Sequence, residues 1–350
     1  MLDIQLHDLP AILLHINADD RDVWFKVGNG LKTEFGEDAY SHWDTWSQSA
    51  ETYNRKDARG VWDSLAVGKC TLGTVIYLAQ QTGWKPNKRD LTPAEKRQLK
   101  QEQEQRRAER EAQIEADTAK RETMQGVVAK NCLKIWENFC HDFGESEYLK
   151  KKQVGGFGIR FFHQSVLLWI DDDSQSTGVL TGGKIMKFFD KLPKPRPDHI
   201  SFLFFKKGTI VIPLRDVDGK LWSLQAISAT DKLFPKYGRK AGLYHIIGNL
   251  TGATVVAFAE GYATGASIHM ATEWPVVVAF DAGNLVSVAA TVRKQCPDAK
   301  LLICADLDEN GKGQAKAHEA ASASGAAVVL PDFGDVQTTL DVTDKQARSL

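Results

Sequence analysis

The sequence predicts a chain of several domains with mixed α/β and α+β structure: an N-terminal helical bundle, a long charged helical linker, a basic α+β subdomain and a C-terminal α/β domain with a mainly parallel sheet. Three observations predict this organisation. Aromatic and aliphatic residues recur at helical spacing before about residue 84, residues 92–123 are mostly charged residues, Gln and Ala, and two later apolar runs each stop at carboxylates. With 350 residues and 43% hydrophobic content, the chain can form two or three cores.

Residues 1–84 carry separate apolar stripes that are typical of a small helical bundle. Trp24 and Phe35 belong to one stripe, and further tryptophans follow. The last helix is expected to begin at Thr71 and to stop at Gly83. The residues alone leave two interpretations open: a core of buried tryptophans with no binding function, or a module that binds a partner.

Residues 85–144 are predicted to form a helical linker. Thr92 is a suitable N-cap, Pro93 suits the first helical position, and Glu95 completes a capping box. No apolar stripe follows before Val127, so we expect a solvent-exposed helix held by charge pairs four residues apart rather than a coiled coil. Beyond that point an apolar stripe returns, and the helix is expected to dock there.

Charge is distributed unevenly although the whole chain is nearly neutral, with a formal net charge of -1. Residues 150–250 contain 17 Lys and Arg against 8 Asp and Glu, whereas residues 251–350 contain 7 against 12. The first segment also alternates short strand-like runs with turns. A basic segment beside an acidic one fits a protein that holds a polyanion in one part and does metal chemistry in the other, and a solvated basic surface is the alternative.

Cysteine usage and hydropathy indicate an intracellular protein. The five cysteines are widely spaced and form no C-x-x-C pair, so we expect reduced, packed thiols. No apolar stretch has the length needed to span a membrane, and no signal-peptide pattern begins the chain. We therefore expect a cytoplasmic protein.

Two apolar runs are predicted to deliver carboxylates to one edge of the C-terminal sheet. One run ends at Glu260, and the other ends at Asp306 and Asp308. Parallel strands of an open α/β sheet end where such sheets bind ligands. Three carboxylates at that edge suit Mg²⁺, with Mn²⁺ as an alternative ion, and indicate metal-assisted phosphoryl transfer. Turn and helix-capping roles are the alternative for the two aspartates.

These residues resemble the Toprim domain of primases and topoisomerases, whose signature is a Glu on one strand and Asp-x-Asp on a later one. The closer resemblance is to Toprim primase-like replication proteins of phages and plasmids, and it covers residues from about 145 to 345. The stretches that carry it are FAEGYATGAS at 258–267, VVAFDAGNL at 277–285 and ADLDENGKGQ at 305–314, with 212–227 and 238–248 upstream. The stretches 43–47, 60–62 and 71–74 resemble the PriCT helical module of many such primases.

The resemblance implies a DNA primase, a DNA-directed RNA polymerase of primase type that makes short primers on single-stranded DNA from nucleoside triphosphates, working with a separate replicative helicase. Residues 145–250 would be the basic subdomain of the primase core and 251–350 its Toprim domain, behind the PriCT-like module at 1–84 and the linker at 85–144. The implied catalytic metal ligands are Glu260, Asp306 and Asp308. The implied nucleotide-binding or DNA-binding residues are Arg160, Lys232, Lys236, Arg239, Lys240, His245, Lys312 and Asn284.

The sequence also departs from a full replicative primase. It has no Cys or His cluster with zinc-ligand spacing and no G-x-x-x-x-G-K-[ST] loop. Near the C-terminus Thr343 stands where the family often has Asn, so only Asp341 or Asp344 matches its acidic motif. The chain ends soon after the Toprim region, which leaves little room for the helical subdomain that normally follows. A Toprim nuclease and a non-catalytic replication accessory or inhibitor are therefore the two alternative functions.

Overall fold

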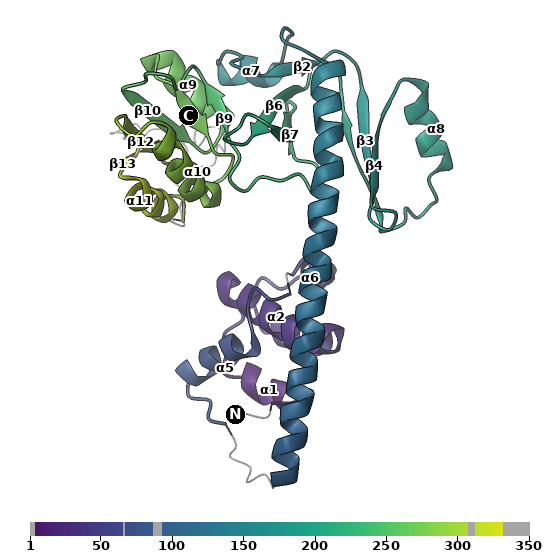
Figure 1. Cartoon of the computed structure of the whole chain (residues 1–350). Coiled ribbons are helices and arrows are strands. Elements are labelled where there is room, and N and C mark those ends of the chain that lie inside the picture. The colour runs from purple at the N-terminus through teal and green to yellow at the C-terminus, as the bar shows by residue number, and fades with distance from the viewer. Residues whose placement is uncertain (1–3, 66, 87–92, 307–311, 332–350) are drawn as a thin grey trace. The chain divides into compact units, whose positions relative to one another are not determined.

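The computed structural model describes residues 4–65, 67–86, 93–306 and 312–331. They divide into two compact units, Met1–Ala119 and Lys120–Leu350 (Figure 1). The first unit is helical, and the second contains all the described strands. None of the described helices combines the length and the apolar composition that crossing a membrane requires.

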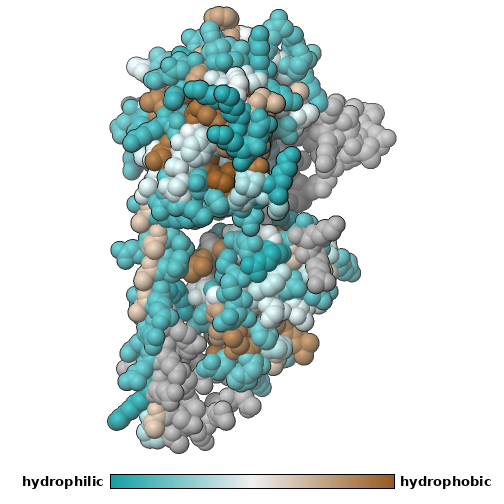
Figure 2. Space-filling model, turned by 90° about the vertical axis from the view of Figure 1, so that its right-hand side faces the viewer, coloured by the Kyte–Doolittle hydropathy of each residue, from teal (hydrophilic) through white to brown (hydrophobic). Residues whose placement is uncertain are grey.

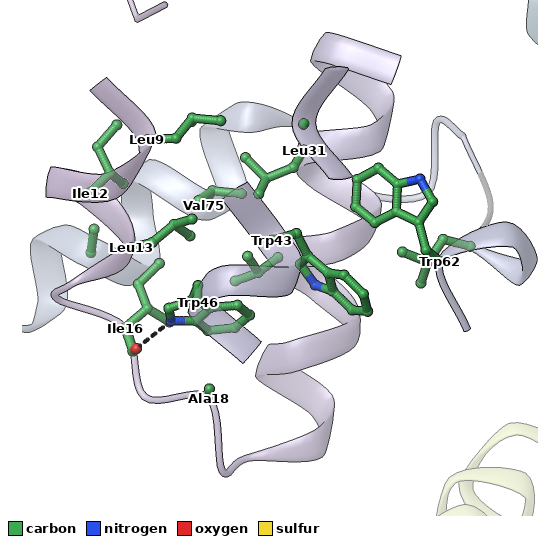
Figure 3. Packing of buried hydrophobic residues seen from close by; sticks show 14 of the residues in the cluster. Leu9, Ile12, Leu13, Ile16, Ala18, Leu31, Trp43, Trp46, Trp62 and Val75 are labelled. Carbon is green, nitrogen blue, oxygen red and sulfur yellow. Dashed lines mark hydrogen bonds between the residues drawn. The ribbon is translucent and has the colours of Figure 1, made fainter. Parts of the chain in front are cut away.

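The first unit packs its helices around buried tryptophans, which the aromatic spacing predicts. Trp43 and Trp62 are fully buried with ring centroids 5.2 Å apart. The indole Nε1 of Trp46 donates a hydrogen bond of 2.8 Å to the carbonyl of Ile16 (Figure 3). Buried indoles with satisfied N–H groups explain how so small a bundle forms a core. Its elements are η1 (Leu6–Asp8), α1 (Leu9–Leu13), α2 (Arg21–Phe35), η2 (Gly36–Ala39), α3 (Tyr40–Ser47), α4 (Arg55–Ser64) and α5 (Leu72–Gln81).

A single long helix, α6 (Pro93–Asn138), follows, and its start agrees with the Pro93 signal, while Thr92 lies outside the described residues. The sequence predicts a solvent-exposed charged part, but the structure buries some of it. Arg110 donates from Nε to the carbonyl of Thr33 at 3.0 Å and from a terminal nitrogen to Glu34 at 2.5 Å. This pairing allows the planar guanidinium to be buried. The predicted apolar stripe does dock in the second unit, through buried Met124, Val128, Cys132 and Ile135.

Two antiparallel sheets form the basic part of the second unit. One has the order β1-β2-β6-β7-β8, and the other has the order β4-β3-β5. Their strands are β1 (Cys140–His141), β2 (Arg160–Phe162), β3 (Val166–Asp171), β4 (Ser176–Thr181), β5 (Ile200–Phe205), β6 (Ile210–Arg215), β7 (Leu221–Ile227) and β8 (Lys232–Leu233), with the helices α7 (Glu147–Lys152) and α8 (Gly183–Lys191).

The third sheet has the order β13-β12-β10-β11-β9, and all its pairings are parallel except that of β9 with β11. This confirms the predicted mainly parallel sheet. Side chains of β10 alternate between two cores: Val256 and Phe258 pack with α10 and α11, whereas Ala257 and Ala259 pack with α9. The elements are β9 (His245–Ile247), β10 (Val255–Ala259), α9 (Tyr262–Thr272), β11 (Val276–Val278), α10 (Ala282–Gln295), β12 (Lys300–Cys304), α11 (Lys312–Ser324) and β13 (Ala327–Val329).

Candidate functional site

The predicted carboxylates follow adjacent parallel strands. Strand β10 ends directly before Glu260, and β12 ends two residues before Asp306. The register pairs Phe258 with Ile303, so both acids leave the sheet at the same edge. Glu260 is half-buried and Asp306 is exposed. Asp308 lies outside the described residues, as do Asp341 and Asp344.

A third strand end contributes to this edge. Strand β11 runs parallel to β10, and Asp281 follows it as the N-cap of α10, where its Oδ1 accepts a hydrogen bond of 2.9 Å from the backbone N–H of Asn284. The other oxygen, Oδ2, lies 3.4 Å from Nζ of Lys240. Phe280 precedes this cap at a φ of 70°, which is unusual for a bulky residue and marks a backbone held by its surroundings.

Asn284 connects the basic subdomain to the sheet edge. Its Oδ1 accepts from the Gly242 N–H at 2.7 Å, and its Nδ2 donates to the carbonyls of Leu243 and Ala279 at 2.8 and 2.9 Å. The side chain is 6% exposed, so these bonds use its hydrogen-bonding groups inside the protein. The structure therefore gives Asn284 a positioning role, fixing the loop that carries Lys240.

Arg239 and its neighbours form an aromatic and basic group beside this loop. The Arg239 guanidinium lies 4.8 Å from the ring centroid of Trp222, and Lys220 Nζ lies 3.7 Å from the same ring. Trp222 Nε1 donates to Asp216 at 2.7 Å, which fixes the indole. Sequence analysis identified Arg239 as a binding residue but not Lys220 or Trp222; Trp222 lies on β7, and Lys220 directly precedes that strand.

The remaining cations of the basic subdomain differ in how far their charge is paired. Arg160 donates from Nε to Asp142 at 2.6 Å, and Lys236 forms an ion pair with Asp172. Lys232 is exposed. Burial, and then the positive charges of Lys232 and Lys151, lower the pKa of Lys152, which the sequence did not single out. The structure thus brings Lys240 and Asn284 to the acidic edge, while Arg160 and Lys236 pair with other acids, Asp142 and Asp172. Lys312 begins α11, directly after residues that are not described.

His245 is 5% exposed, and its Nε2 lies 2.8 Å from the carbonyl oxygen of Phe157. Burial lowers its pKa to about 4, so the ring is neutral at pH 7. It lines a hollow of about 270 Å³ together with Trp136 and Arg215. Its predicted nucleotide contact stays a prediction, and a neutral ring would make that contact by hydrogen bonding rather than by charge.

Tyr262 is another buried side chain near the site, and sequence analysis did not identify it as a site residue although it stands two residues after Glu260. Its hydroxyl accepts a hydrogen bond from Phe157 N–H at 2.7 Å and donates to the carbonyl of Gly155 at 2.9 Å. Burial raises its pKa to about 12. These contacts anchor the loop before β2 to the first turn of α9, next to the acidic edge.

The two described carboxylates are of the ligand type that a hard divalent cation binds. Glu260 and Asp306 supply carboxylate oxygens at one sheet edge, which is the ligand type that Mg²⁺ takes. Within residues 4–65, 67–86, 93–306 and 312–331, no group of three or more His, Cys, Asp or Glu side chains gathers as a metal site. The third predicted ligand, Asp308, lies outside those ranges.

Comparison with known families finds matches for two parts of the chain, the helical bundle and the region of the mainly parallel sheet. Residues 9–79 match the family model "Primase C terminal 2 (PriCT-2)", and residues 255–344 match the family model "Toprim domain". The first match lies in the helical bundle, and the second begins with the first strand of the acidic edge.

Two curated relatives, both named DNA primase TraC and both from Escherichia coli, are similar to part of the chain. One is 38% identical over 133 residues, covering 35% of this chain and 12% of the relative. The other is 35% identical over 139 residues, covering 37% of this chain and 10% of the relative. The matched part therefore spans only about a tenth of each relative's length.

Solved structures of DnaG primase are similar to a lesser degree. The DnaG catalytic domain bound to single-stranded DNA gives a TM-score of 0.34 at 15% identity, covering 66% of this chain and 79% of that chain. The DnaG catalytic core gives 0.35 at 15% identity, covering 65% and 77%. TM-scores of this size are too low to support a conclusion about the fold. The chain thus contains a PriCT-2 module near its N-terminus and a Toprim domain near its C-terminus, and part of it is similar to DNA primase TraC.

Proposed function

We propose that this chain is a DNA primase-like nucleotidyltransferase that makes short primers on single-stranded DNA in phage or plasmid replication. The observation that carries the proposal is the placement of Glu260 and Asp306 after adjacent parallel strands of the Toprim sheet, with Lys240 held at the same edge. In the reaction, a 3′ hydroxyl forms a bond to an α-phosphorus, pyrophosphate leaves, and the hydroxyl proton passes to a base or to solvent. A bound Mg²⁺ would neutralise charge that develops on the phosphate.

The chain's own residues would orient the nucleotide. Lys240 and Asp281 are 42% and 44% exposed, and their 3.4 Å separation makes a weak pair, because exposed ion pairs contribute only about 0 to 1 kcal/mol. An incoming phosphate can therefore replace Asp281 as the partner of Lys240 at little cost. Asn284 keeps that lysine's loop at the sheet edge. The half-buried Glu260 would act as a metal ligand or as a base through water.

The domain assignment that goes with this proposal makes residues 145–250 and 251–350 the two parts of the primase core. The module at residues 1–84, joined through residues 85–144, would bind a replication partner such as a separate helicase. Leu14 and Tyr77 support this, because they are 85% and 59% exposed on a unit whose other large apolar side chains are mostly buried.

A priming assay tests the proposal. Purified protein would be incubated with single-stranded DNA, labelled ribonucleotides and Mg²⁺ or Mn²⁺, and the products would be resolved on a denaturing gel. We expect short oligomers from the wild type and at least about a 100-fold loss in Glu260→Gln and Asp306→Asn, since each removes a charge at the reacting phosphate. The matched control is Glu273→Gln, an exposed glutamate at the other end of α9. Retained priming in either acidic-edge variant excludes the assignment, and DNA cleavage or DNA binding without synthesis would instead identify a nuclease or an accessory protein.

A further inference from the structure

A second basic surface lies on the three-stranded sheet β4-β3-β5 and its helix α8. Residues 183–207 contain seven Lys and Arg against two Asp and Glu, and all seven cations are exposed. Across the part of the chain that the structure describes, none of the seven forms an ion pair with a carboxylate. The seven, which we call the α8 cations, are Lys184, Lys187, Lys191, Lys194, Arg196, Lys206 and Lys207.

Three of the α8 cations lie along one face of the helix. Lys184, Lys187 and Lys191 follow one another at i, i+3 and i+7, which places them within about 60° around the helix axis and along about 10 Å of its length. The opposite side of α8 is apolar, with Ile185 buried and Phe189 packed edge to face against Phe202. The helix is thus fixed on the sheet by its apolar side and presents its lysines outward.

An apolar hollow of about 280 Å³ lies next to these lysines, beside the first turn of α8 and on the sheet face that the helix covers. Phe204 and Met186, which are 38% and 65% exposed, line it together with Gln164, Ser165, Gly182 and Ile185. The strand register pairs Val166 with both Thr181 and Phe205, so Lys206 leaves β5 at the end of the sheet where the hollow lies. Figure 2 views the molecule from the side on which α8 lies in Figure 1, and shows small apolar groups in brown among hydrophilic residues in teal.

We propose that this surface binds a single-stranded nucleic acid, with an unpaired base against Phe204 in the hollow and its phosphates on the α8 cations. Exposed rings that stack on bases, surrounded by cations that contact phosphates, are how proteins hold single strands with little sequence preference. Gln164 and Ser165 offer amide and hydroxyl groups to a base edge. A duplex has no free base face to offer the ring. The surface uses none of the residues of the acidic edge, so the proposal goes beyond the proposed function.

Binding of a fluorescent thymidine oligonucleotide to the full chain, followed by anisotropy without Mg²⁺ or nucleotides, tests the proposal. Lys187→Gln with Lys191→Gln should weaken binding about 25-fold at about 0.1 M salt and lower the salt slope by about 1.4, because each lost phosphate contact contributes about 0.7 to that slope. The matched control removes two exposed lysines of the Toprim sheet and its helix, Lys294→Gln with Lys300→Gln. Equal losses in the two double variants would refute a specific surface.

A second variant tests the stacking contact. Phe204→Leu keeps an apolar, partly exposed side chain, and it should weaken binding of the oligonucleotide by about five-fold or more while leaving binding of the matching duplex unchanged. Photocrosslinking of a 5-iodouracil oligonucleotide should label the peptide that contains Phe204. Unchanged affinity in Phe204→Leu, or crosslinks only elsewhere, would overturn the proposal. Asp306→Asn separates the proposed priming function from the proposed binding surface, since it should abolish priming and leave binding of the oligonucleotide intact.

Discussion

Replacing Asn284 by Ala should loosen the loop that carries Lys240. The substitution removes hydrogen bonds to three backbone groups, those of Gly242, Leu243 and Ala279. Each such bond contributes about 1 kcal/mol, and buried partners left unsatisfied add to the loss, so the local free energy of opening should fall by about 3 kcal/mol. At 25 °C this corresponds to roughly a 150-fold increase in the open population of the loop.

Hydrogen exchange read by mass spectrometry on peptides covering residues 239–248 measures this change directly. The matched control is Ser287→Ala, because Ser287 donates only to Asn284 itself, at 3.0 Å to its carbonyl and 3.1 Å to its Oδ1, and should cost less than about 1 kcal/mol. Peptides from the helical bundle should exchange as in the wild type. If exchange in the loop were equal in Asn284→Ala and Ser287→Ala, the amide would not be the link between the two parts of the site.

Two further predictions concern packing and pH. Gly30→Ala should destabilise the helical bundle by about 1 to 3 kcal/mol in chemical denaturation, since a Cβ there would lie 2.7 Å from Val75, whereas Gly60→Ala, which meets nothing within 4 Å in α4, should be neutral or stabilise by up to about 1 kcal/mol. The buried His245 has its pKa lowered from 6.5 to about 4, so its contribution to stability is complete above pH 6.5 and is lost, by about 3 kcal/mol, as the pH falls toward 4. Urea denaturation from pH 7 to pH 4 should show this slope in the wild type and a flatter one in His245→Gln; equal slopes would contradict the assignment.

Local patterns predicted several elements of the fold. The helix expected from Thr71 to Gly83 is α5 (Leu72–Gln81), with Thr71 as its N-cap, and the short strand-like runs expected within residues 150–250 include β3 (Val166–Asp171). These signals work because period and end residues depend on the segment alone. The contact of α6 with the bundle through Arg110 depends on a partner 76 residues away, Glu34, and no local pattern in a charged helix reveals it.

The sequence predicted the positions of the acidic side chains of the candidate site better than the positions of its basic side chains. Carboxylates that follow apolar runs are placed by the strands themselves, so the order of β10 and β12 brings Glu260 and Asp306 to one edge. A cation on a loop has no such constraint. Whether it faces a ligand or an internal acid is decided by tertiary contacts, and Arg160 donates to Asp142 while Lys240 reaches the sheet edge.

The link through Asn284 also bears on how the two parts of the proposed primase core work together. Lys240 belongs to a loop that follows the basic sheet, yet Gly242 and Leu243, directly after it, are hydrogen-bonded to an amide at the start of α10. On the proposed function, phosphate binding by Lys240 and carboxylate chemistry at the sheet edge would therefore share one anchor, Asn284. A phosphate that is misplaced by about 1 Å can slow such a reaction by about 100-fold. On the proposed function, Asn284→Ala should for this reason lower priming more than Lys240→Ala does. The first substitution displaces the whole loop, whereas the second removes one charge.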